Sequence, residues 1–83
     1  MQDEKIRNWI IDYFVQTNKI DREEMLGLLD ADYFELGYID SMSLMAFVIE
    51  IENNFKIRFD AEHFQDKQFT NISGLSKMIL NLI

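Results

Sequence analysis

The segment from Asp40 to about Asn54 is the strongest structural signal in the sequence. Its apolar residues recur at the three- and four-residue spacing of an α-helix, and Asp40 or Ser41 can serve as the N-cap. One stripe is assigned to the core and consists of Leu44, Phe47, Val48, Ile51 and Phe55. Strand-type alternation is scarce in the rest of the chain, which contains no proline. An all-α fold follows from this pattern.

The same helix carries a second apolar stripe on a largely opposite side. It consists of Met42, Met45 and Ile49, with Ala46 beside it. A helix that is apolar on two sides is either deeply buried or presents a surface to a partner. In a domain this small we favour a partner surface, and contact with the long preceding loop is the alternative.

Three further helices complete the expected architecture. Asp3 can cap a first helix that runs to about Thr17, with Ile6, Ile10, Tyr13 and Phe14 on its apolar face. Asp60 can cap a short third helix over about 61–66. Thr70 or Asn71 can cap a fourth from Ile72 to about Leu82. We therefore predict a four-helix bundle with a long first loop and a short third helix.

The long first loop, from about Asn18 to Asp40, is unusual for a compact domain. It carries apolar side chains that can attach it to the helices: Ile20, Met25, Leu28, Leu29, Phe34, Leu36 and Ile39. A short helical turn is possible within 22–29. Gly37 can supply a positive φ just before the next helix.

Size and composition exclude several classes of function. A chain of 83 residues is expected to form one domain, 1–83, with a modest core and no deep substrate pocket. The absence of cysteine excludes disulfides, thiolate metal sites and a protein-borne thiol nucleophile. The single histidine, His63, argues against a multi-histidine metal site and a Ser-His-Asp triad. Asp30, Asp32 and Glu35 lack the full ligand spacing of an EF-hand, so a solvated loop is the better interpretation. We predict neither an enzyme nor a metal protein.

The charge balance limits the possible partners. Eight Lys and Arg residues stand against fifteen Asp and Glu residues, which gives a net charge of −7. Binding to nucleic acid or to an anionic membrane is therefore disfavoured, and basic protein partners are favoured. No apolar run approaches the roughly 20 residues needed to span a membrane, and no signal peptide is visible. We expect a cytoplasmic monomer.

Ser41 is the main candidate functional residue. Its hydroxyl lies at the predicted start of a helix and at the end of a long loop. The first N–H groups of a helix lack intrahelical partners, and the helix dipole adds partial positive charge there. A phosphate ester on Ser41 would lie where the backbone favours an anion. This arrangement suits a covalent carrier site better than a catalytic one.

The segment around Ser41 resembles the phosphopantetheine attachment motif of the acyl carrier protein family, written F-x-x-G-x-(x)-D-S-L. Here it reads Phe34-Glu35-Leu36-Gly37-Tyr38-Ile39-Asp40-Ser41-Met42. The similarity continues through residues 48–57, which resemble the family's acidic-x-x-F-x-I exit from the helix, and weakly at 69–72. The Asp-Ser pair alone is a weak signal. The upstream glycine, the apolar helix, the exit motif and the length together make the resemblance specific.

The resemblance implies that Ser41 carries 4′-phosphopantetheine as a phosphodiester, with Asp40 as its motif neighbour. The arm would supply the thiol that the chain lacks and hold an acyl or aminoacyl group as a thioester. Implied partners are a phosphopantetheinyl transferase and the cognate ligase and synthase enzymes of a fatty-acid, polyketide, peptide or related biosynthetic pathway. Met42, Met45, Ala46 and Ile49 would form the partner surface.

Two departures from the fatty-acid carrier pattern bear on the cargo. Met42 replaces the usual leucine, and Tyr38 and Ile39 separate Gly37 from Asp40 where many fatty-acid carriers have one residue. The longer spacing resembles D-alanyl carriers and freestanding carriers of peptide or polyketide assembly. An aminoacyl carrier of the D-alanyl type is therefore one alternative. An unmodified helical protein-interaction module is the other, and it would tolerate alanine at position 41.

Overall fold

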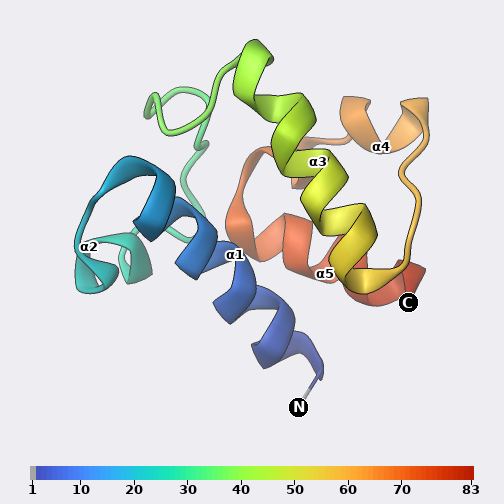
Figure 1. The fold of residues 1–83 in the computed structure, drawn as a ribbon, viewed down its shortest axis with the longest axis horizontal. Helices are drawn as coiled ribbons and strands as arrows, with labels where there is room; N and C mark the ends of the chain where they lie inside the picture. Colours follow the sequence, from blue (N-terminus) through green and yellow to red (C-terminus); the bar gives the residue numbers. More distant parts are fainter. Residues whose placement is uncertain (1) are drawn as a thin grey trace.

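The structure is a computed structural model that describes residues 2–83, and over that range it contains helices and no strand. Its α-helices are α1 (Gln2–Asn18), α2 (Arg22–Leu26), α3 (Ser41–Phe55), α4 (Ala61–Gln65) and α5 (Ile72–Leu82). A 3₁₀ segment, η1 (Lys67–Thr70), precedes α5 (Figure 1). The all-α prediction is confirmed. The four-helix count is not, because α2 forms within the segment that we expected to be mainly loop.

Side-chain caps explain where the helices begin. Asp40, rather than Ser41, is the N-cap of α3, and Asn71, rather than Thr70, is the N-cap of α5. Asp60 caps α4 as predicted. Asp3 was predicted to cap the first helix, but it lies within the first turn of α1. Acidic residues in a first turn still interact favourably with the helix dipole.

The core lies where α1, α3 and α5 meet. Figure 1 shows α1 and α3 on either side of α5, with α2 and α4 at the periphery of the molecule. Phe14 of α1 packs against Phe47 of α3 with ring centroids 5.1 Å apart, and Leu75 and Ile79 of α5 are fully buried. The predicted core stripe of α3 is buried at Phe47, Val48 and Ile51. Leu44 and Phe55, at its two ends, are only partly buried.

Some of the apolar side chains that were predicted to attach the long first loop to the helices do so. Met25 and Ile39 are buried, whereas Leu36 was expected to pack inward and is 42% exposed. The strongest anchor is Tyr33, which sequence reasoning missed and which is 1% exposed. Its hydroxyl donates a hydrogen bond to the Phe69 carbonyl, and its backbone N–H donates to the Thr70 carbonyl at 3.0 Å. The connection is thereby fixed to the entry of α5.

No helix within residues 2–83 is both long enough and apolar enough to cross a lipid bilayer.

Candidate functional site

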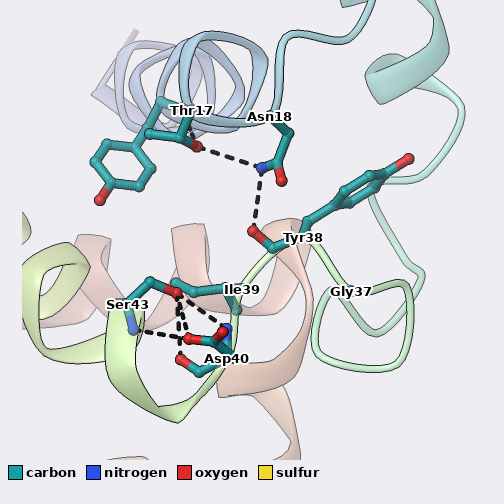
Figure 2. A pocket seen from close by; sticks show the side chains of 8 residues that line it. Thr17, Asn18, Gly37, Tyr38, Ile39, Asp40 and Ser43 are labelled. Carbon is teal, nitrogen blue, oxygen red and sulfur yellow. Dashed lines mark hydrogen bonds between the residues drawn. The ribbon is translucent and has the colours of Figure 1, made fainter.

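The start of α3 is organised by a capping box between Asp40 and Ser43. Asp40 Oδ1 accepts hydrogen bonds from the backbone N–H groups of Met42 at 3.1 Å and Ser43 at 2.8 Å. In return, Ser43 Oγ accepts the backbone N–H of Asp40 at 3.0 Å, and its own hydroxyl donates to Asp40 Oδ1 (Figure 2). Ser43 was not predicted to take part in the cap. The three-residue spacing between the two side chains was the available signal.

These contacts also set the charge state of Asp40. The hydrogen bonds from the backbone N–H and the hydroxyl of Ser43, with a smaller contribution from Met42, hold the pKa of the Asp40 carboxyl below its usual value. The side chain is therefore an anion at neutral pH. A fixed negative charge lies next to the hydroxyl of the following residue.

Ser41 is the first residue of α3 and is exposed. Among the hydrogen bonds within residues 2–83, none involves its hydroxyl or its backbone N–H, whereas the N–H groups of Met42 and Ser43 already serve Asp40. The sequence led us to expect several free N–H donors at the start of α3 that could bind an anion. Most of the free donors of the helix start are taken by the cap, and the N–H of Ser41 itself remains open.

The loop before Ser41 has a defined shape. Gly37 has φ of +79°, as predicted, which an L side chain adopts only with strain. The Tyr38 carbonyl accepts a hydrogen bond from the Asn18 amide at 3.1 Å, and the same amide donates to the Phe14 carbonyl at 3.2 Å. Figure 2 shows this bridge from the end of α1 to the loop. Together with buried Ile39, it fixes the position of the α3 start relative to α1.

A polar hollow of about 260 Å³ lies between the end of α1 and the start of α3. Its walls include Tyr13, Thr17, Asn18, Tyr38 and Ser43 (Figure 2). Ser41 is not among them. Two residues along an α-helix turn the side chain by roughly 200°, so Ser41 and Ser43 face opposite sides of α3. A group on Ser41 would leave the domain on the side away from this hollow.

On the Ser41 side, α3 carries exposed apolar residues. Met42 is 88% exposed, Met45 60% and Ile49 50%, and Ala46 is exposed between them. The alternative in which the long loop covers this stripe is wrong, because side chains under a loop would not retain such exposure. The four residues Met42, Met45, Ala46 and Ile49 are referred to below as the α3 apolar patch.

The other polar candidates have structural roles. Asp32 accepts the backbone N–H groups of Phe34 and Glu35, which shapes the turn, and within residues 2–83 no group of three acidic or histidine side chains is placed to hold a metal ion. His63 accepts the backbone N–H of Asp60 at its Nδ1 atom at 2.9 Å. It completes a second capping box, at the start of α4.

Comparison with known proteins identifies the family. The family model described as a phosphopantetheine attachment site matches residues 8–79, most of the chain. The chain therefore belongs to this family, that of the acyl carrier proteins. A D-alanyl carrier protein from Streptococcus sanguinis is 36% identical over 42 residues, which are 51% of this chain and 53% of that protein. One from Leuconostoc citreum is 27% identical over 66 residues, which are 80% of this chain and 85% of that protein. No solved structure gives a significant match.

Two points follow from these comparisons. The chain spans about half the length of the streptococcal relative that it matches. Family membership implies a carrier domain with covalently attached 4′-phosphopantetheine, as the sequence resemblance indicated. The exposed hydroxyl at the start of α3 fits such a group, because neither a buried wall nor an internal hydrogen bond competes for it.

Proposed function

We propose that Ser41 is the attachment residue, and that the chain holds an acyl or aminoacyl group as a thioester on the phosphopantetheine arm. The observation that carries the proposal is the exposed, unpartnered hydroxyl at the first position of α3, directly after the capping aspartate. Because the chain contains no cysteine, the arm must supply the thiol. The chain itself carries out no chemistry, and separate enzymes load, modify and unload the cargo.

Within this function Asp40 has two roles. Its carboxylate fixes the start of α3 and so positions the Ser41 hydroxyl. Its negative charge, one residue away, is suited to help position the metal ion and coenzyme A of a phosphopantetheinyl transferase. In the loading reaction the Ser41 oxygen forms a bond to the phosphorus that bears the pantetheine arm. The bond to the nucleotide part of coenzyme A breaks, and the serine proton passes to a base of the transferase.

The α3 apolar patch is the proposed docking surface for partner enzymes. It lies on the same side of α3 as Ser41, so a partner bound there is close to the base of the arm. Exposed apolar side chains of this size on a small domain favour binding to a complementary surface. The net charge of −7 adds long-range attraction to basic partners.

Aminoacyl cargo is the first class to test. The relatives named above are called D-alanyl carrier proteins, and the spacing of two residues between Gly37 and Asp40 resembles that subclass. We infer that an amino-acid-activating ligase is the loading partner. The fatty-acid, polyketide and peptide pathways remain the other cargo sources to test.

The experiment is an endpoint loading assay. The protein is incubated with a promiscuous phosphopantetheinyl transferase and coenzyme A, and its intact mass is measured. Wild type should gain one phosphopantetheine, Ser41→Ala none, and Ser43→Ala one, because Ser43 serves only the cap. Modification of Ser41→Ala, or none of the wild type, contradicts the proposal.

The same assay separates the carrier from an unmodified interaction module, which the exposed α3 apolar patch alone would also fit. A module that binds a partner helix through Met42, Met45 and Ile49 needs no hydroxyl at position 41. Binding unchanged by Ser41→Ala, together with an unmodified wild type, would favour the module.

A further inference from the structure

A groove between α1 and α3 lies away from Ser41. It joins two open hollows of about 270 and 330 Å³ that share Trp9 and Glu50 in their walls. The remaining lining comes from Asp12, Tyr13 and Gln16 of α1 and from the end of α3. We call it the α1–α3 groove.

Aromatic rings form the floor of this groove. Trp9 stacks on Tyr13 with ring centroids 5.8 Å apart and an interplanar angle of 21°, and it forms a T-shaped pair with Phe55 at 5.5 Å. Trp9 is only partly buried, although both neighbours hold its ring in place. Among the aromatic side chains, tryptophan attracts a cation over its ring most strongly.

The walls of the groove are acidic. Glu50 and Asp12 line it, and no lysine or arginine does. Among the ion pairs within residues 2–83, none includes Glu50. Glu50 lines the first hollow together with Trp9 and Tyr13, so its carboxylate lies beside the aromatic rings. The groove therefore combines negative charge with an aromatic face.

The rim already holds a guanidinium group from this chain. Arg22 pairs with Asp12, and its Nη2 atom donates to Asn8 Oδ1 at 2.8 Å. The contact shows that this edge of α1 presents oxygen acceptors at guanidinium spacing. It leaves Glu50, across the groove, without a cation.

The position of the groove separates it from the carrier site. Glu50 lies nine residues after Ser41, which at about 100° per residue places it on the opposite side of α3. A molecule in the groove would therefore leave Ser41 accessible.

We propose that the α1–α3 groove is a second docking site, which takes an arginine side chain from a peptide segment of a protein partner. The guanidinium lies on the Trp9 ring and pairs with Glu50. Such a partner can hold the carrier while enzymes act on the other side. The inference does not depend on modification of Ser41.

The test uses the full chain and its single tryptophan. Tetra-arginine amide is titrated into the protein while Trp9 fluorescence and backbone amide chemical shifts are recorded, with the neutral isostere tetra-citrulline amide in parallel. The arginine peptide should give a saturable change in Trp9 emission and shifts centred on Trp9 and Glu50. The citrulline peptide should give neither.

Two matched variants decide whether the groove is specific. Glu50→Gln should weaken binding by roughly two- to fivefold, the range of one exposed ion pair. Glu62→Gln removes the same charge from α4 and should leave the affinity unchanged. Equal weakening by both variants, shifts located elsewhere, or no saturable binding would overturn the proposal. Loading of Ser41 should be the same in both variants, so failure here leaves the proposed function standing.

Discussion

At the residue scale, neighbouring residues at the start of α3 have different roles. Asp40 and Ser43 form the capping box and bind the N–H groups of Met42 and Ser43, so the Ser41 side chain is not needed for the cap. Its hydroxyl remains exposed and available for modification. The proposed attachment residue is therefore distinct from the capping residues, although they are adjacent in the sequence.

Asp40→Asn should slow phosphopantetheine loading more than it weakens folding, because asparagine also caps helices well. The lowered pKa of Asp40 adds stability that is fully present above its unfolded value of 3.8 and is lost as the pH falls through the folded value. The variant should lose this acid dependence. Loading kinetics at neutral pH and urea unfolding at pH 7 and pH 3 measure both effects. Unchanged loading kinetics would show that Asp40 is only structural.

Tyr33→Phe should destabilise the fold by about 1–3 kcal/mol, because the buried Phe69 carbonyl loses its hydrogen-bond donor. Burial, with a smaller contribution from Asp32, raises the pKa of Tyr33 above its usual 10.0. Its stabilising contribution is therefore present below pH 10 and is lost as the pH rises further. Urea unfolding at pH 8 and pH 10.5 should show a smaller alkaline loss in Tyr33→Phe than in wild type. An equal loss would contradict the assignment.

At the element scale, most helices were predictable because their signals are local. Asp40, Asp60 and Asn71 stand at cap positions before apolar runs of helical period, and the structure uses all three as caps. Tyr33 was missed because its partner, Phe69, is 36 residues away and no short-range pattern marks the contact. Leu36 was misplaced because hydrophobicity alone does not say which loop residue faces inward.

The close approach of η1 to α5 depends on Gly74. A Cβ atom there would lie 2.5 Å from the backbone carbonyl oxygen of Gln68. Gly74→Ala should therefore cost about 1–3 kcal/mol, although alanine favours helices. Gly27→Ala is the matched control, since its nearest contact would be an ordinary 3.5 Å. Thermal unfolding of both variants measures the difference, and equal stability would refute the packing argument.

At the scale of the whole molecule, α3 presents one surface to the core, an exposed apolar surface and a third surface to the α1–α3 groove. The sequence showed its two apolar stripes but left open whether the loop covers the second. Burial of Phe47 and exposure of Met45 decide that point, because only tertiary packing sets which stripe meets α1 and α5. The role of the exposed stripe in docking remains a prediction.

Met45→Glu and Ile49→Glu should each change stability by less than about 0.5 kcal/mol, because both side chains are mostly exposed. Both should slow loading by a phosphopantetheinyl transferase if the α3 apolar patch is the docking surface. Phe47→Ala, in the core, should cost about 3–5 kcal/mol. Thermal unfolding and initial loading rates separate the two effects. If Ile49→Glu unfolds the domain, the patch belongs to the core instead.

The identity of the modified residue is the central claim, and peptide mapping of the loaded protein tests it most directly. The loaded wild type is digested, and the peptide that spans Asp40 to Ser43 is fragmented in a mass spectrometer. Fragments on either side of the Ser41–Met42 bond distinguish the two hydroxyls of this peptide. We predict that the whole phosphopantetheine mass lies on Ser41. Phosphopantetheine on Ser43, or on any other residue, would contradict the account.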